Sequence, residues 1–231
     1  MFERVLTAFY GGTFDPIHYG HLRPVIALAR LVNLQRVIML PNNVPPHRPQ
    51  PVASVQQRLA MARLAIAELP DPLFTLDKYE LQRPTPSYTV NTFEALRRKY
   101  GPDAPLAFII GQDSLLTLSQ WHRGLELPAL CHLLVCARPG YDDELADERG
   151  NRWLARRLTR DSQALHRQPA GLIYCAATPQ LAISASDIRA RYREGRDCDG
   201  LLPPSVQGYI DAQGLYSSMA HSQAKCTKNV I

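Results

Sequence analysis

The segment 11–21, with the sequence GGTFDPIHYGH, gathers the residue types that most clearly suggest chemistry. Its paired glycines, Gly11 and Gly12, allow positive φ angles and a close approach of the backbone to a ligand. His18 and His21 are three residues apart, so at a helix start both imidazoles can point toward an anion that the free amides hold. The glycine between them leaves room for a flat group against the backbone. Together these features favour a phosphate-binding loop.

Other interpretations of the same segment exist. Two histidines at this spacing can bind a metal ion, but no third ligand of suitable spacing lies nearby in the sequence. Either histidine alone is more often structural, and a glycine pair alone is often an ordinary turn. The segment does not match the GxGxxG fingerprint, which argues against a nicotinamide-dinucleotide cofactor bound in the usual manner.

A second segment, 183–189, has the sequence ISASDIR. A hydroxyl group that caps a helix at Ser184, followed by Arg189 about one turn later, can clamp the oxygens of a polyphosphate. Without the first segment, this stretch would be interpreted as an ordinary N-capped helix with an exposed arginine.

Short apolar runs alternate with helical stretches along the chain, which predicts an α/β fold with a Rossmann-like, doubly wound parallel sheet and a small C-terminal helical part. In such a sheet, ligands bind beyond the carboxyl ends of the strands at the switch point, between strands 1 and 4. The segments 11–21 and 111–122 would meet there. The strands are expected at 4–10, 36–40, 73–76, 106–110, 133–137 and 172–176, and the helices near 20–32, 54–69, 89–100, 184–194 and 205–213.

Composition and charge limit the class of protein further. The chain has 231 residues, 45% of them hydrophobic and 20% charged, with a net charge of +5. We expect one domain over 1–216 and a disordered or artificial tail over 217–231. The odd number of cysteines without a CxxC pair indicates reduced thiols. The absence of a leader and of long apolar runs predicts a soluble, cytoplasmic protein without a membrane partner, and the modest basic balance gives little support to nucleic acid.

Several motifs resemble one family closely. His18-Tyr19-Gly20-His21 is similar to the HxGH motif of the nucleotidylyltransferase superfamily, and 183–189 is similar to its second element. There, Ala185 departs from the common Ser-Ser/Thr pattern, so either Ser184 or Ser186 could face phosphate. Together with 41–48, 87–92, 111–114 and 121–122, these motifs resemble the bacterial nicotinate-nucleotide adenylyltransferases over 6–216.

The resemblance implies that nicotinate mononucleotide attacks the α-phosphorus of ATP, giving nicotinate adenine dinucleotide and pyrophosphate. It implies Mg²⁺ bound through ATP and pyrophosphate oxygens, with no protein metal site. His18, His21 and Arg189 would be catalytic. Asp113 would accept ribose hydroxyls, Trp121 would face the pyridine ring, and amides near Thr89 and His122 would bind its carboxylate. The implied ATP site comprises Gly11, Gly12, Thr13, Phe14, His18, Gly20, His21, Gly111, Asp113, Ser184, Ile188 and Arg189, and the implied mononucleotide site Asn42, His47, Arg48, Thr89, Trp121 and His122.

Two other functions remain open at this point. One is another adenylyltransferase of the same fold, such as the phosphopantetheine enzyme, which commonly has Thr at the position of His18. The other is a non-catalytic nucleotide-binding regulator. The sequence does not define an oligomeric state and is compatible with a homo-oligomer.

Overall fold

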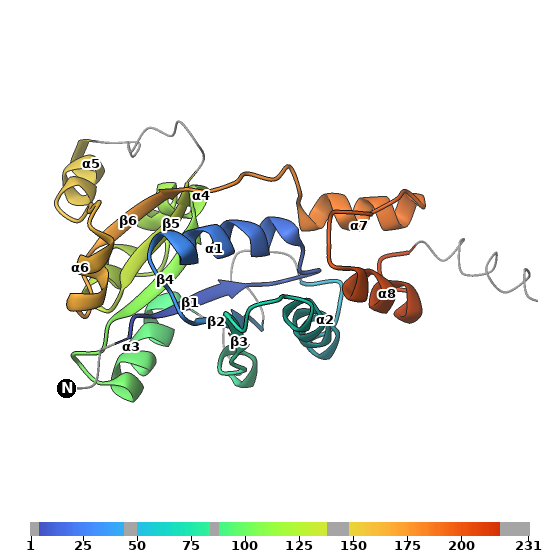
Figure 1. Ribbon diagram of the computed structural model, residues 1–231, viewed down its shortest axis with the longest axis horizontal. Coiled ribbons are helices and arrows are strands. Elements are labelled where there is room, and N and C mark those ends of the chain that lie inside the picture. Colours follow the sequence, from blue (N-terminus) through green and yellow to red (C-terminus); the bar gives the residue numbers. More distant parts are fainter. Residues whose placement is uncertain (1–4, 44–49, 84–87, 138–147, 218–231) are drawn as a thin grey trace, which may run out of the picture.

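The computed structural model describes residues 5–43, 50–83, 88–137 and 148–217. Its centre is a six-stranded, all-parallel sheet in the order β3-β2-β1-β4-β5-β6 (Figure 1). This arrangement confirms the predicted doubly wound α/β class, because the chain winds outward from β1 in one direction and from β4 in the other. The strands are β1 (Thr7–Gly12), β2 (Val37–Pro41), β3 (Phe74–Leu76), β4 (Leu106–Gly111), β5 (His132–Ala137) and β6 (Ile173–Ala177).

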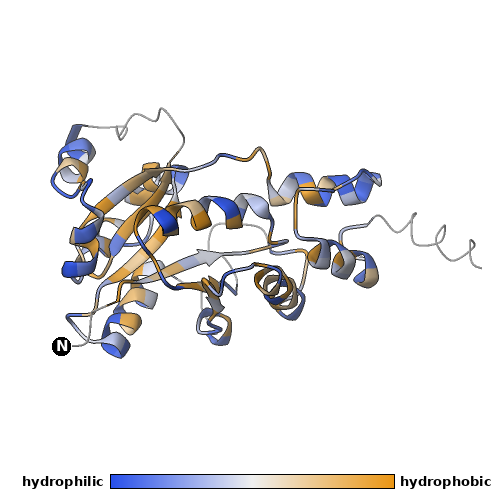
Figure 2. Ribbon diagram, in the orientation of Figure 1, coloured by the Kyte–Doolittle hydropathy of each residue, from blue (hydrophilic) through white to orange (hydrophobic). Residues whose placement is uncertain are grey.

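Helices cover both faces of the sheet. Alternate residues of each strand point to opposite faces, so Ala8 belongs to one hydrophobic cluster and Phe9 to the other. The first cluster packs α1, α2, α6, α7 and α8 on one face, and the second packs α3, α4 and α5 on the other. In Figure 2, hydrophobic colour concentrates in the sheet and on the helix sides that face it. The helices are α1 (Tyr19–Leu31), α2 (Val55–Ala67), α3 (Thr89–Tyr100), α4 (Gln112–Leu116), α5 (Glu148–Ala155), α6 (Ser162–Arg167), α7 (Ala185–Glu194) and α8 (Pro204–Gln213).

Local sequence signals account for several helix ends. Ser54 caps α2 reciprocally with Gln57, since each side chain bonds the backbone amide of the other residue at 3.2 and 2.9 Å. Gly195 and Gly214 end α7 and α8 in the left-handed conformation, with φ of 66° and 60°. The helices α7 and α8 form the predicted C-terminal helical part and lie beyond the carboxyl end of β1 (Figure 1).

The first strand and helix differ from the prediction. Gly11 and Gly12 are not left-handed but complete β1 in register with Leu40 and Pro41, and the positive φ of this region, 51°, belongs to Phe14. The two glycines therefore do not adopt the positive φ that their residue type allows. The helix α1 begins at Tyr19, which places Pro24 in its second turn, where it cannot donate to the carbonyl of Gly20.

The charged residues that follow β5 include an exposed ion pair on α5. Arg152 pairs with Glu148 one turn away on α5 at 2.8 Å, and both side chains are exposed, which is typical of a solvated helix face. Residues 142–147 and 218–231 lie outside the described residues.

Within the described ranges, Cys131, Cys136, Cys175 and Cys198 are free thiols. No helix in these ranges is both long and apolar enough to cross a bilayer.

Candidate active site

The two histidines lie at the N-terminus of α1, beyond the carboxyl ends of β1 and β4. Their rings stack with centroids 3.7 Å apart and an interplanar angle of 27°. The backbone N–H of His18 donates to Nδ1 of His21 at 3.3 Å. Because Nδ1 of His21 accepts this bond, its proton is on Nε2, which makes that atom a hydrogen-bond donor.

His18 is buried to 4% exposure, and this burial lowers its pKa to about 4. The ring is therefore neutral at physiological pH. Its Nδ1 is buried and has no hydrogen-bond partner among the described residues. A neutral, partly unsatisfied imidazole beside a donor imidazole is suited to polar contact with a ligand.

At Gly12 and Gly20, a Cβ atom would come too close to a neighbouring ring unless that ring moved. A Cβ on Gly20 would lie 2.9 Å from the His18 ring and 3.0 Å from the carbonyl oxygen of Ile183. The sequence predicted room for a flat group against the backbone at Gly20, and the ring of His18 occupies that position. A Cβ on Gly12 would lie 2.7 Å from the ring of Phe14, whose edge in turn contacts His21 at 5.3 Å between centroids.

The second predicted element, at the start of α7, reaches the same loop. Nη1 of Arg189 donates to the backbone carbonyl of Asp15 at 2.6 Å. The Arg189 side chain is 25% exposed, so its remaining N–H groups are available to an anion. Ser184 caps α7 by accepting from the amide of Asp187 at 3.1 Å, and the Ser184 hydroxyl lies 3.0 Å from that of Ser186.

Ile188 differs from the other predicted ATP-site residues. Its side chain is fully buried in the first core cluster, and its amide donates to the carbonyl of Ser184 within the helix. The Ile188 side chain therefore packs α7 against the core.

Asp15 is a residue that sequence reasoning did not single out. Its buried carboxylate accepts from the amides of Val52 and Ala53 at 2.8 and 3.1 Å and from the hydroxyl of Tyr216 at 2.7 Å. These bonds join the loop after β1 to the start of α2 and to the segment after α8. The sequence around a single Asp in a loop does not indicate that its hydrogen-bond partners lie 37 and 201 residues away.

The loop after β4 lies beside this region, as predicted from the strand order. Gly111 caps α4, and the space where its side chain would be is open to at least 4 Å. Asp113, in the first turn of α4, is exposed. Its carboxylate is thus accessible from solvent next to the open space at Gly111.

The predicted pyridine-binding residues come from two elements. The ring of His122 contacts that of Tyr88, with centroids 4.4 Å apart, and Tyr88 is the N-cap of α3, directly before Thr89. Trp121 is half-buried and packs against the second core cluster. This contact brings the backbone amides of the first turn of α3 close to the loop that carries Trp121.

Asn42 lies at the end of β2. The backbone N–H of Asn42 donates to the carbonyl of Gly12 at 3.0 Å, while its side-chain Oδ1 is buried without a partner among the described residues. The predicted residues His47 and Arg48 lie outside the described residues.

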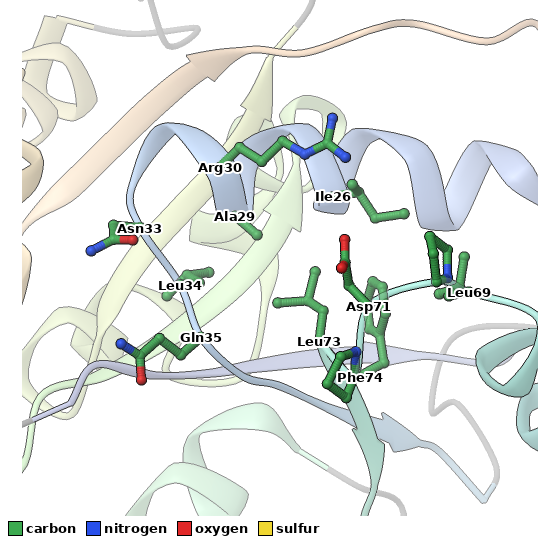
Figure 3. A pocket seen from close by; sticks show the side chains of 12 residues that line it. Ile26, Ala29, Arg30, Asn33, Leu34, Gln35, Leu69, Asp71, Leu73 and Phe74 are labelled. Atoms are coloured by element: carbon green, nitrogen blue, oxygen red, sulfur yellow. The ribbon is translucent and has the colours of Figure 1, made fainter.

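A cavity of about 430 Å³ lies between the C-terminal half of α1 and the segment 69–74, where Arg30 and Asp71 come from opposite walls (Figure 3). None of the predicted site residues lines it. Within the residues that the structure describes, no group of three or more His, Cys, Asp or Glu side chains is placed to hold a metal ion.

The sheet order and the histidine pair at its switch point define a nucleotide-binding α/β protein of the nucleotidyl-transferring class. Residues 9–191 match the family model described as cytidylyltransferase-like. The chain is 92% identical over 216 residues to a probable nicotinate-nucleotide adenylyltransferase of Sodalis glossinidius (strain morsitans), covering 94% of this chain and 99% of that protein. It is 63% identical to the probable nicotinate-nucleotide adenylyltransferase of Cronobacter sakazakii (strain ATCC BAA-894), covering 91% and 95% of the two chains. The chain therefore belongs to the cytidylyltransferase-like family and, within it, to the nicotinate-nucleotide adenylyltransferases.

The fold is also similar to that of solved structures. Plasmodium falciparum nicotinic acid mononucleotide adenylyltransferase, complexed with NaAD, aligns with a TM-score of 0.66 at 18% identity, covering 92% of this chain and 97% of that one. A putative nicotinate-nucleotide adenylyltransferase from Vibrio parahaemolyticus aligns with a TM-score of 0.60 at 16% identity, covering 92% and 95%. At these identities the comparison supports the fold.

Proposed function

We propose that this chain transfers the AMP group of ATP to nicotinate mononucleotide, giving nicotinate adenine dinucleotide and pyrophosphate. The observation that carries the proposal is the arrangement around the loop after β1. There the stacked rings of His18 and His21 stand at a helix N-terminus, and Arg189 reaches the same loop through the carbonyl of Asp15. The imidazoles and the guanidinium together form a site for polyphosphate, whereas the amides of His18, Tyr19 and His21 already bond within the protein.

The reaction is a single in-line displacement. An oxygen of the mononucleotide phosphate forms a bond to the α-phosphorus of ATP, and the bond from that phosphorus to the bridging oxygen of the β-phosphate breaks. The pyrophosphate leaves with the electron pair. Because a phosphate monoester is largely ionised near neutral pH, the attacking group needs neither a general base nor a protein nucleophile. The residues act by positioning and by stabilising charge.

The proposed roles follow from the position of each residue. His21 donates from Nε2 to an α-phosphate oxygen, where charge grows in the transition state, and His18 contacts the neighbouring phosphate. Arg189 and the serine pair at the start of α7 hold the leaving pyrophosphate. Asp113 accepts from a ribose, beside the open space at Gly111.

The mononucleotide lies between the loops that follow β2 and β4. The half-buried Trp121 offers a ring face to the pyridine, and the amides near Thr89 and His122 bind its carboxylate. The Oδ1 of Asn42, which has no partner among the described residues, would accept from a hydroxyl donor on this substrate.

The described side chains do not form a cage for Mg²⁺. We therefore place Mg²⁺ with the substrate, bound to oxygens of ATP and pyrophosphate, and assign no step of the reaction to a protein-bound ion.

The test is a pyrophosphate-release assay with ATP and, in turn, nicotinate mononucleotide, nicotinamide mononucleotide and phosphopantetheine. The proposal predicts the highest kcat/KM with nicotinate mononucleotide. A preference for phosphopantetheine would favour a different adenylyltransferase, and ATP binding without turnover of any partner would favour a regulator.

A further inference from the structure

Arg58 is an unusual residue for the interior of α2. Its side chain is 1% exposed, and burial lowers the pKa of its guanidinium. The guanidinium donates to two backbone carbonyls, from Nη1 to Thr13 at 2.6 Å and from Nη2 to Asn43 at 3.2 Å, and the nearby Asp15 carboxylate partly offsets the lowering of its pKa. The planar fork of arginine can make two such bonds at once, whereas a lysine ammonium is a single point of charge.

The two carbonyls belong to different loops. Thr13 follows β1 in the loop proposed to bind ATP, and Asn43 follows β2, next to the proposed mononucleotide residue Asn42. The side-chain amide of Asn43 also donates to the carbonyl of Arg83 at 3.2 Å. Arg83 follows the short helix 80–82 and precedes the segment that leads to Thr89. A series of hydrogen bonds thus runs from the ATP loop through Arg58 and Asn43 to the backbone of Arg83, which precedes α3 in the chain.

We propose that Arg58 and Asn43 are positioning residues that couple the ATP loop to the mononucleotide loops, so that binding of one substrate favours binding of the other. Arg58 is shared by both loops, whereas the side chain of Asn43 serves only the mononucleotide side. The two residues therefore differ in the substrate that they affect. This inference rests on the proposed function, because it uses the assignment of the loops to the two substrates.

The experiment compares the wild type with Arg58→Lys, Arg58→Met and Asn43→Ala. The matched control is Arg63→Met, which changes an exposed arginine of the same helix. Steady-state kinetics give kcat and both KM values. Calorimetry gives the Kd of α,β-methylene-ATP with and without saturating nicotinate mononucleotide, and thermal unfolding shows at which temperatures each variant is folded.

In the wild type, the mononucleotide should tighten binding of the ATP analogue, and this coupling is reciprocal. Arg58→Lys keeps the charge but loses one bond of the fork, so we expect it to raise both KM values about tenfold. The ratio of the Kd values of the ATP analogue, measured without and with the mononucleotide, should fall toward one. Asn43→Ala should raise KM for the mononucleotide about fivefold and leave KM for ATP unchanged, on the scale of one lost hydrogen bond. Arg63→Met should leave all these values unchanged.

A purely structural role gives a different result. It lowers the unfolding temperature and the active fraction but leaves both KM values and the coupling as in the wild type, and this result overturns the inference. Arg58→Lys decides the question if Arg58→Met does not fold. Absence of coupling in an active wild type also overturns the inference while leaving the proposed function intact, whereas a wild type that does not turn over the mononucleotide overturns both.

Discussion

The backbone N–H of His18 donates to Nδ1 of His21, and the two imidazoles stack 3.7 Å apart. This relationship gives the two histidines different tasks. The bond leaves Nε2 of His21 as the donor, while burial keeps His18 neutral. Two positive charges at this ring separation would repel each other strongly in a site shielded from water. In the proposed function the pair would therefore act on phosphate through oriented hydrogen bonds.

His21→Ala should lower kcat by about 10²- to 10³-fold, because a donor aimed at growing charge contributes mainly in the transition state. The Kd for α,β-methylene-ATP should change only a few-fold. His21→Gln places an amide N–H near the position of Nε2 and should recover part of the lost rate. A His21→Ala variant with near-normal kcat would exclude His21 from the chemical step.

Arg189→Lys should mainly raise KM for ATP, by about tenfold, because an ammonium cannot reproduce a fork of donors to phosphate oxygens. The substitution also weakens the bond to the carbonyl of Asp15, which holds the loop in place. The measurement is steady-state kinetics with ATP varied at saturating mononucleotide. Arg193→Lys, at an exposed position of the same helix, is the control. An unchanged KM at position 189 would indicate an ordinary surface arginine.

The sequence predicted the features that depend on short-range patterns. The reciprocal cap of Ser54 and Gln57 and the glycine caps Gly195 and Gly214 have residue types and spacings typical of helix ends. The alternation of apolar runs with helical stretches predicted the doubly wound parallel sheet. The conformation of the loop after β1 did not follow, because positive φ falls on Phe14, a residue type for which it is uncommon.

The supports of the site depend on contacts between distant parts of the chain. Arg58 lies in a helix whose sequence does not distinguish it from the exposed Arg63, and its buried guanidinium bonds to two carbonyls in separate loops. Asp15 and Tyr216 meet only when the C-terminal segment returns to the first loop. Residue types and spacing carry no record of such partners, so the histidine motif was predictable and the network that holds it was not.

Glu80→Gln should stabilise the protein at alkaline pH. The Glu80 carboxyl is 8% exposed and accepts from Oγ1 of Thr92 at 2.9 Å, and burial raises its pKa to about 7. The folded protein therefore favours the protonated form, and the associated stability is full below the ordinary pKa of 4.5 and lost as pH rises through about 7. The amide of Gln keeps an oxygen for Thr92 but has no proton to lose.

At about pH 8 the free energy of unfolding should rise by up to about 3 kcal/mol, because the pKa of Glu80 is about 7 in the folded protein and 4.5 when it is unfolded. Near pH 4.5 the wild type and the variant should be similar. Urea unfolding at both pH values measures the difference. Asp71→Asn, at an exposed position, should give no such pH-dependent gain. Equal pH profiles for the wild type and Glu80→Gln would mean that Glu80 is ionised in the folded protein at neutral pH.

Substrate choice follows from one group, since nicotinate carries a carboxylate where nicotinamide carries a neutral amide. Backbone N–H donors near Thr89 and His122 would satisfy both carboxylate oxygens but would meet the amide NH₂ with another donor. One unpaired buried donor costs roughly 1–3 kcal/mol, and about 1.4 kcal/mol is a factor of ten. We therefore expect kcat/KM for nicotinate mononucleotide to exceed that for the nicotinamide form by at least about tenfold. Equal values would exclude a carboxylate site made only of donors.

Trp121→Ala separates the ring face from the carboxylate site. Stacking on an indole does not sense the charge of the substituent, so the variant should raise KM for both mononucleotides by a similar factor and leave their kcat/KM ratio unchanged. The control is Trp153→Phe, because Trp153 is the other tryptophan of the chain and packs against the same core cluster. This control also leaves Trp121 as the sole tryptophan, whose fluorescence should change when nicotinate mononucleotide binds. If selectivity were lost together with Trp121, the ring face would set the preference, and the amides at the start of α3 would have only a structural part.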